Sequence, residues 1–410
     1  MAYKAPNYFN LTNYLNTLTR QITPVQPFQE IIDNSIQYNS TDISVVFDAD
    51  RDLAYIKDNG DGMNLETFMG SYHELNSVPN ESSGISTYGV GSKVFVRLTT
   101  LRITLTRDKL SGECYYSILD ASSGDTFANP HIDDMVDGII PEILQPYSRL
   151  VKMFFLGKVG TMVILPNITD WPSTGKNRTG HVSCEKFRDT CFESFRKRYE
   201  HCIYSNREVN ISVGLTKNDK TIFEAIEAQN IIDGTIFSKI TDKTGDVEVV
   251  TYLTENIRTR QEITLVRNDI KFDRGCSFVR NPKRGSNPVS VGTPKYKMIR
   301  QTVFWKSKSD GLFSNIDPYK TSGALDWELL EICANEYSKI TEHLDSQKIT
   351  STSPHSNIAP SELGIKCAQQ IVKKYPKDKD IREFTTGFNN EIFNKTQTTN
   401  NNIGAQNDAI

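Results

Sequence analysis

The sequence predicts an α+β fold with a helix, a β-hairpin and further strands of one sheet, and three observations lead to this prediction. Apolar side chains recur at helical spacing in residues 27–38, which begin with a proline. Residues 43–57 form two apolar runs joined by a polar turn, as in a β-hairpin. Residues 101–106 and 113–119 alternate like strands of one sheet, and residues 160–166 are typical of an inner strand of that sheet.

The predicted helix over residues 27–38 carries a carboxylate and an amide on one face. Glu30 and Asn34 are four residues apart, so their side chains project from consecutive turns of the same face. Side chains placed in this way can hold a water molecule and a hard cation together. Because Mg²⁺ takes few protein ligands and shares phosphate oxygens with a nucleotide, the pair indicates a magnesium–nucleotide site.

A stretch with two glycines, Asp58-Asn-Gly-Asp-Gly-Met63, follows the second strand of the hairpin. Asp58 is suited to accept a hydrogen bond from an exocyclic amine. Gly60 and Gly62 permit positive φ and allow a flat ligand to approach the main chain closely. Met63 offers a polarisable apolar wall to an aromatic ring, so this stretch predicts a pocket for a base.

A third motif, Tyr88-Gly-Val-Gly-Ser-Lys93, leads into an apolar, helix-like run over residues 90–98. Glycine-rich backbone at a helix N-terminus presents N–H groups and a positive dipole end to phosphate oxygens. Lys93 adds a mobile positive charge. The order and spacing of all three motifs predict one nucleotide pocket.

Each motif alone has a more common explanation. A Glu and an Asn on one helix face are usually a solvated edge. The two-glycine stretch could be a turn or part of a calcium loop, but Glu66 falls too early and Glu74 too late to complete an EF-hand. The third motif suggests a P-loop, yet it lacks the four-residue gap and the flanking strand of one.

Together the three motifs resemble those of the GHKL ATPase superfamily, which includes gyrase B, the large heat-shock chaperone, histidine kinases and MutL. Glu30-Ile-Ile-Asp-Asn34 and Tyr88-Gly-Val-Gly-Ser-Lys93 are most similar to MORC-type and related prokaryotic ATPases. The resemblance implies a Bergerat-type two-layer α/β sandwich that binds ATP and Mg²⁺. Two departures are Gln37-Tyr38, where Asp-Ala commonly follows the first motif, and the additional charge of Asp61 between the glycines.

The resemblance also implies roles for individual residues. Glu30 would be the general base for the attacking water, Asn34 the Mg²⁺ ligand and Asp58 the acceptor for adenine. A lid over about residues 64–92 would close on the nucleotide, and a loop lysine, Lys320, would reach the γ-phosphate. The remaining residues implied to contact the nucleotide are Gly60, Gly62, Met63, Gly89, Val90, Gly91, Ser92, Lys93 and Thr161.

The chain is expected to form three parts. Residues 1–167 would be the ATP-binding domain, with a polar N-terminal segment over residues 2–26 that packs on its own domain or reaches a second protomer. Residues 168–345, which include predicted strands at 209–215, 247–252 and 276–280, would form a second α/β domain resembling a transducer. Residues 346–410 would hold a helical segment and a flexible, low-complexity tail rich in Asn, Thr and Gln.

A strongly amphipathic helix is predicted over residues 183–202. Its histidines and cysteines have the spacing of no ordinary zinc module, so the helix is assigned to the core. The apolar stripe consists of Phe187, Cys191, Phe195, Tyr199 and Cys202, and the polar residues around it include Arg188, Glu193, Arg196, Lys197 and Arg198.

Composition limits the class of protein. The 410 residues carry a net charge of −3, so no global footprint of nucleic-acid binding is visible. Seven cysteines without a CxxC pair favour a reducing compartment. With no signal-peptide core and no apolar stretch long enough for a membrane span, we expect a soluble, cytoplasmic protein without a membrane partner.

The local distribution of charge is compatible with a nucleic-acid partner. A basic run with nearby aromatic residues could contact a phosphate backbone, although such runs are usually solvated faces. Its members are Arg274, Arg280, Lys283, Arg284, Lys295, Lys297 and Arg300, with Tyr296 and Trp305 close by.

The combined prediction is an ATP-dependent switch that forms a homodimer on ATP and acts as a clamp or remodeller on DNA or an effector protein. A histidine-kinase module is disfavoured because Glu30 suits hydrolysis and no histidine lies on a plausible dimerisation helix beside an acid. The ATPase subunit of a topoisomerase-like or defence complex, with its effector on another chain, and a non-catalytic nucleotide-gated scaffold stay open as alternatives.

Overall fold

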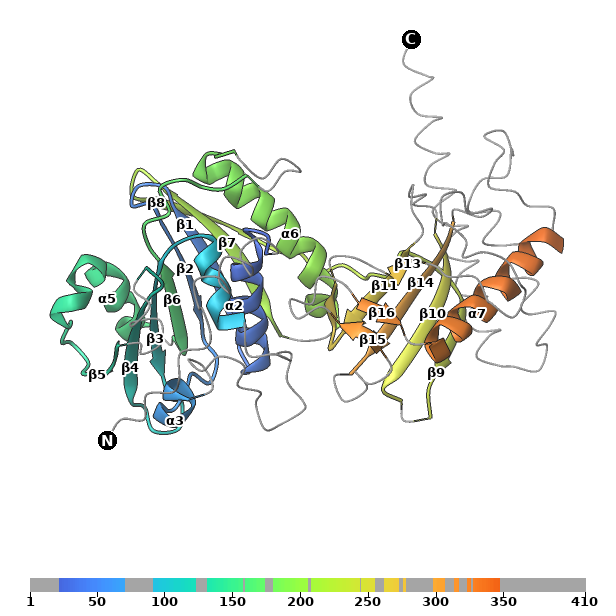
Figure 1. Ribbon diagram of the computed structural model, residues 1–410, viewed down its shortest axis with the longest axis horizontal. Coiled ribbons are helices and arrows are strands. Elements are labelled where there is room, and N and C mark those ends of the chain that lie inside the picture. Colours follow the sequence, from blue (N-terminus) through green and yellow to red (C-terminus); the bar gives the residue numbers. More distant parts are fainter. Residues whose placement is uncertain are drawn as a thin grey trace, which may run out of the picture.

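The computed structural model describes residues 22–70, 91–122, 131–157, 159–173, 180–205, 208–243, 245–254, 262–272, 276–277, 298–306, 313–316, 323–325 and 327–346. These residues form two large sheets, each with helices packed against it, and α6 extends from the first sheet towards the second (Figure 1). The predicted N-terminal segment up to residue 21 and the tail beyond residue 346 lie outside the described residues.

The first sheet has eight strands in the order β5-β4-β3-β6-β2-β1-β7-β8. Neighbouring strands are antiparallel except β1 and β7, which run parallel. The strands are β1 (Asp42–Asp48), β2 (Leu53–Asp58), β3 (Leu101–Arg107), β4 (Cys114–Asp120), β5 (His131–Met135), β6 (Thr161–Leu165), β7 (Asn210–Lys217) and β8 (Lys220–Ala225).

Helices cover both faces of this sheet (Figure 1). One face carries α2 and α6 with the short η1, and the other carries α5 and η2. The helices of this part are α2 (Gln26–Gln37), α3 (Leu65–Met69), η1 (Gly91–Arg97), η2 (Glu142–Tyr147), α5 (Ser148–Leu156) and α6 (Cys184–Tyr204).

The alternation of side chains along β1 explains why both faces are covered. Ile43, Val45 and Phe47 point into the core shared with α2 and α6, whereas Val46 lies in the core shared with α5. Phe28 is central to the first of these cores and is fully buried, with its ring 5.0 Å from that of Phe47. The predicted helix, hairpin and inner strand are therefore confirmed in this sheet.

The structure adds one strand that the sequence analysis did not predict, since β5 pairs with β4 at the sheet edge. Two expectations need correction. The two-layer description omits α5, whose Leu150, Val151 and Phe154 bury the second face. The strand predicted at 209–215 belongs to the first sheet and not to the second domain, because β7 pairs with β1.

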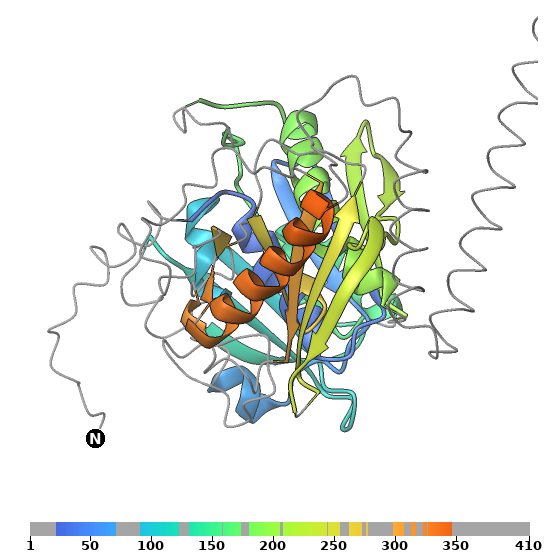
Figure 2. The same ribbon diagram turned by 90° about the vertical axis from the view of Figure 1, so that its right-hand side faces the viewer.

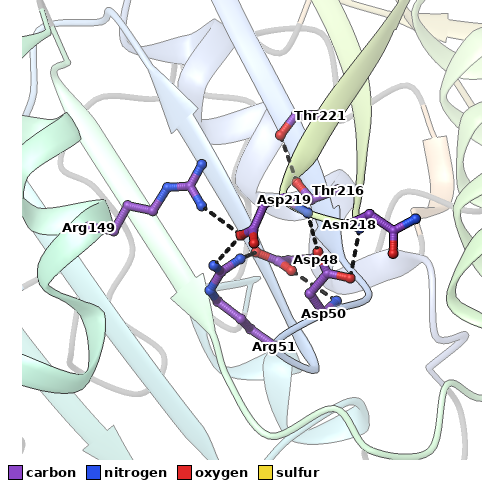
Figure 3. Close-up of polar contacts among 8 residues, drawn as sticks. All are labelled: Asp48, Asp50, Arg51, Arg149, Thr216, Asn218, Asp219 and Thr221. Atoms are coloured by element: carbon purple, nitrogen blue, oxygen red, sulfur yellow. Dashed lines mark hydrogen bonds and ion pairs between the residues drawn. The ribbon is translucent and has the colours of Figure 1, made fainter.

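A cluster of polar contacts joins the β1–β2 turn to the β7–β8 turn (Figure 3). The carboxylate of Asp50 accepts the backbone N–H groups of Asn218 (3.0 Å) and Asp219 (2.8 Å), both of which have positive φ. Arg51 bridges Asp48 (3.1 Å) and Asp219 (2.7 Å). Because exposed ion pairs contribute little, the contacts to backbone N–H groups are what fix the relative position of the two turns.

The second sheet has the order β12-β11-β14-β10-β9, with β13 paired to β11. Helix α7 lies across its strands, as the turned view shows (Figure 2), and a separate pair is formed by β15 and β16. The elements are β9 (Gly234–Thr241), β10 (Val247–Thr254), β11 (Glu262–Arg267), β12 (Ile270–Lys271), β13 (Cys276–Ser277), β14 (Ile299–Trp305), β15 (Phe313–Ile316), β16 (Gly323–Leu325) and α7 (Trp327–Ser346).

The second sheet also corrects the predicted basic surface. Arg300 and Trp305 lie on β14 and are buried, with the Trp305 ring 5.3 Å from that of Phe272. Both side chains are therefore part of the packing of the second sheet and do not form a surface. The other members of the basic run lie outside the described residues. Among the helices that the structure describes, none combines the length and hydropathy that a bilayer crossing requires.

Replacement of Phe28 by alanine is expected to lower the free energy of unfolding of the first domain by about 3–5 kcal/mol, because it leaves a cavity among tightly packed rings. The measurement is denaturant unfolding followed by circular dichroism. The control is Leu156→Ala, whose side chain is 89% exposed and should change stability by about 0.5 kcal/mol or less. Equal effects of the two variants would contradict the central position of Phe28.

Candidate functional site

Helix α2 presents the predicted catalytic side chains at the edge of the first core. Pro27 occupies its first turn, and the helix ends where the Tyr38 N–H donates to the Asn34 carbonyl (3.0 Å). Burial of the apolar side chains at 28, 32 and 36 fixes which face of the helix points to the sheet. Glu30 is 3% exposed and Asn34 is partly exposed one turn later, so the helical spacing predicted for the pair is confirmed.

Asp58, the last residue of β2, is held by donors from three different segments. Its Oδ1 accepts the backbone N–H groups of Gly60 (2.9 Å) and Thr161 (3.2 Å). Its Oδ2 accepts the Ser35 hydroxyl of α2 (2.8 Å). The carboxylate is thus fixed relative to the two-glycine loop, strand β6 and the helix that carries Glu30 and Asn34.

Burial changes the pKa of the Asp58 carboxyl. The side chain is 7% exposed, and loss of solvent raises the pKa of its carboxyl, an effect partly offset by the three hydrogen bonds. An ionised carboxylate has about four acceptor positions. Within the described residues three of them are used, which leaves one for a donor such as an exocyclic amine.

Gly60, Gly62 and Gly160 are required by backbone packing. Gly62 has φ +67°, and a Cβ there would lie 1.7 Å from the carbonyl oxygen of Arg107. A Cβ on Gly60 would lie 2.7 Å from the Tyr38 carbonyl oxygen, and one on Gly160 only 2.3 Å from that of Gly60. From the sequence, Gly60 and Gly62 were expected to allow the close approach of a ligand. In the structure, the space that a Cβ would need at these glycines is filled by protein backbone. Contact of these glycines with a base stays a prediction.

Thr106 is a buried site residue that the sequence analysis missed. Its hydroxyl oxygen accepts the backbone N–H of Met63 (2.9 Å) and lies 3.4 Å from the Thr161 hydroxyl. It thereby ties the two-glycine loop to β3 and β6. The signal available in the sequence was a threonine at the end of a strand predicted to lie in the same sheet as residues 160–166. Met63 itself is buried and packs against Phe68 and Tyr115.

Asp61, whose effect was not predicted from the sequence, links the two-glycine loop to two neighbouring segments. Its Oδ1 pairs with Lys109 Nζ (2.7 Å), and its Oδ2 accepts the side-chain amide of Asn39 (2.6 Å). These hydrogen bonds, that from Lys109 foremost, lower the pKa of the carboxyl. Asp61 therefore connects the α2–β1 turn with the β3–β4 hairpin.

The C-terminal part of the third motif lies in η1, a 3₁₀ helix that packs against α2 through Phe95. Gly91 begins this helix, so the helix-like run predicted from the sequence is found as 3₁₀ structure. Gly89 and Val90, the side chains of Ser92 and Lys93, most of the predicted lid, and Lys320 lie outside the described residues. Their contacts with phosphate stay predictions.

A buried ion pair lies directly behind α2. Arg198 was predicted on the polar side of its helix, but Arg198 Nη2 and Asp33 Oδ2 are 2.8 Å apart and both side chains are fully buried. The Tyr199 hydroxyl donates to Asp33 Oδ1 (2.9 Å) and contacts the carbonyl oxygen of Gln29 (3.0 Å). The prediction for Arg198 was wrong because its partner lies 165 residues away in the chain.

Part of the chain matches the model of a known protein family. Residues 23–127 match the model of a family described as histidine kinase-, DNA gyrase B-, and HSP90-like ATPase. The matched segment contains α2, the β1–β2 hairpin, the two-glycine loop, η1, β3 and β4. No curated protein matches the chain.

The family match supports the GHKL superfamily and, with it, ATP binding and ATPase activity. A mixed α+β structure with large sheets is consistent with that superfamily. A closer relation to MORC-type ATPases stays a prediction.

Replacement of Gly62 by alanine is expected to destabilise the first domain by about 3 kcal/mol or more, because the new methyl group would overlap the Arg107 carbonyl as well as strain the backbone. Gly112→Ala is the matched control: its φ is +76°, but no atom would lie within 4 Å of a Cβ added there. The control should lose only about 1–2 kcal/mol. Denaturant unfolding of both variants measures the difference, and equal losses would show that packing at Gly62 is unimportant.

The raised pKa of Asp58 predicts a pH dependence of stability. Since burial raises the pKa of this carboxyl above its value in the unfolded chain, its contribution to stability is complete below the ordinary carboxyl pKa and is lost as pH rises through the raised pKa. The free energy of unfolding of the wild type should therefore fall relative to Asp58→Asn over that window. Denaturant unfolding of both proteins across this pH range is the measurement.

Asp61→Asn is the control, because its effect on the pH dependence of stability should have the opposite sign. The pKa of Asp61 is lowered, so the wild type should gain stability relative to this variant as pH rises through the lowered pKa. The effect should be small because the Asp61 side chain is 34% exposed. Parallel curves for the wild type and Asp58→Asn would contradict a raised pKa of the Asp58 carboxyl.

Proposed function

We propose that the chain is an ATP-hydrolysing conformational switch that requires Mg²⁺. The observation that carries the proposal is the buried carboxylate of Asp58, fixed by donors from Ser35, Gly60 and Thr161 with one acceptor position left among the described contacts. The Ser35 donor comes from the same helix as Glu30 and Asn34, so recognition of the base and chemistry at the phosphate would share one element.

Base recognition would use Asp58 as the acceptor for the 6-amino group of adenine. A rigid acceptor rejects a ligand that presents a carbonyl oxygen at the same position, because two acceptors then face each other without a proton. Gly60, Gly62, Met63 and Thr161 would line the base. We therefore expect the protein to bind adenine nucleotides more tightly than guanine nucleotides.

Hydrolysis would use Glu30 as the general base. The Glu30 carboxylate accepts a proton from water while the water oxygen forms a bond to the γ-phosphorus, and the bond from that phosphorus to the β–γ bridging oxygen breaks to release ADP. Glu30 is nearly buried, and a carboxylate in such surroundings is oriented by its helix and shielded from solvent. The positive charge of Lys320 would favour the transition state over the ground state.

The residues present fit a magnesium ion. Asn34 is partly exposed and offers an amide oxygen, the kind of hard ligand that Mg²⁺ accepts alongside phosphate oxygens and water. When bound, the ion would neutralise phosphate charge. Asn34 would hold it on the same helix face as Glu30, which keeps the two functions one turn apart.

The switch itself would consist of closure of the lid on the phosphates, with contacts from Gly89, Val90, Gly91, Ser92 and Lys93, followed by association of two protomers. Hydrolysis would reset the open state. The work would be a clamp or remodelling action on DNA or a protein effector, in a cytoplasmic setting. The second sheet would serve as the transducer-like part of this cycle.

Steady-state hydrolysis of ATP with Mg²⁺ tests the proposal. Glu30→Ala should bind ATP yet lose turnover by about 10²–10⁴-fold, the usual contribution of a general base. The control is Glu193→Ala, which removes an exposed carboxylate on α6 and should keep wild-type turnover. Asp58→Asn should lose nucleotide affinity, since the amide presents a donor where adenine has one.

Oligomer mass with and without a non-hydrolysable ATP analogue tests the switch. A doubling of mass with the analogue is expected. Turnover without a change in mass would limit the protein to a monomeric ATPase, and absence of nucleotide binding by the wild type would overturn the function as a whole.

A further inference from the structure

The C-terminal part of α6 contacts the nucleotide helix and the second sheet within four consecutive residues. Arg198 and Tyr199 bind Asp33 of α2, while Glu200 and His201 lie against the second sheet. Figure 1 shows α6 extending from the first sheet towards the second. This turn of α6 therefore connects the position of α2 with that of the second sheet. The inference below rests on the proposed function of α2.

The contacts on the α2 side set the rotation of that helix. Asp33 lies one position before Asn34 and three after Glu30, so any rotation of α2 that moved Asp33 away from Arg198 would also move both functional side chains. The Tyr199 hydroxyl lies 3.0 Å from the Gln29 carbonyl oxygen, and the Gln29 amide donates to the Ser194 hydroxyl (3.2 Å). Helix α6 therefore holds α2 at two successive turns.

The ion pair is costly for a purely structural contact. Burial removes the hydration of both charges, and apolar side chains of similar volume often stabilise a fold as well or better. What a charged, hydrogen-bonded pair adds is a defined geometry. Here the geometry defined is the register of α2 against α6.

The contacts on the other side tie the same turn to the second sheet. Glu200 Oε1 lies 3.7 Å from Lys271 Nζ at β12, and the His201 ring lies 5.2 Å from that of Phe304 on β14. Because a helical turn moves as a unit, a shift of β12 and β14 would be transmitted to Arg198 and Tyr199.

We propose that the Arg198–His201 turn of α6 is a positioning element that holds Glu30 and Asn34 in register and couples them to the second sheet. Movement of the second sheet during the ATP cycle then changes the placement of the general base. The four residues act through their contacts with α2 and the second sheet, so their substitution should change the turnover number kcat more than KM.

The test uses two single substitutions, one in the turn at its contact with α2 and one in the second sheet. Tyr199→Phe removes one hydroxyl and keeps the packing, and Phe304→Ala removes the ring next to His201. Each should lower kcat about tenfold with KM changed less than about threefold, and the double variant should lose less than the product of the two effects. Arg198→Lys, which keeps the charge, should retain more turnover than Arg198→Met.

Matched controls distinguish coupling from general loss of packing. Tyr116→Phe removes a buried hydroxyl that contacts His131 on the other core, and Phe237→Ala removes a ring that contacts His343 in the second part of the structure. Neither residue faces α6, so both should keep wild-type kcat. Equal losses in the controls and the test variants would overturn the proposal.

Hydrogen–deuterium exchange of the full chain without nucleotide provides a readout that is independent of activity. Tyr199→Phe and Phe304→Ala should accelerate exchange in the peptide covering α2 about tenfold, while the controls leave it unchanged. If the wild type failed to hydrolyse ATP but this pattern held, the proposed function would fall and the coupling would stand. If Phe304→Ala left α2 at the wild-type rate, the coupling would be overturned even with an active enzyme.

Discussion

The candidate site depends on one buried carboxylate. Asp58 brings together the end of β2, the two-glycine loop, strand β6 and helix α2 through its contacts with Gly60, Thr161 and Ser35. Burial disfavours its charged form, so these donors are what allow a carboxylate to stay at that position. The same donors fix its direction, and a fixed acceptor is what recognition of a base requires.

Around this carboxylate, backbone packs against backbone with almost no space. Gly60, Gly62 and Gly160 meet carbonyl oxygens at distances that exclude a Cβ, and the Thr106 hydroxyl fastens the loop to β3. The glycines thus act first on the protein, by allowing β6 and the loop to approach. The loop is thereby held in one position by the protein itself, and pre-organisation of this kind lowers the cost of binding.

Helix α2 is held from two sides. Ser35 connects it to Asp58 on the side of the sheet, and Asp33 connects it to Arg198 and Tyr199 of α6 on the other. Asn34 lies between these two anchors in the sequence and Glu30 lies one turn before them, so the positions of both follow from the anchors. Since α6 also reaches β12 and β14, the placement of α2 is connected to the second sheet.

The sequence by itself determined the local elements: the amphipathic helix with Glu30 and Asn34, the hairpin that ends at Asp58, and the strand that brings Thr161 to it. Periodicity and glycine placement encode such features within a few residues. Tertiary structure alone decided the burial of Arg198, the packing role of Gly62 and the place of β7 beside β1. Each of these depends on a partner distant in the chain, and the pattern around a residue carries no information about which distant group will meet it.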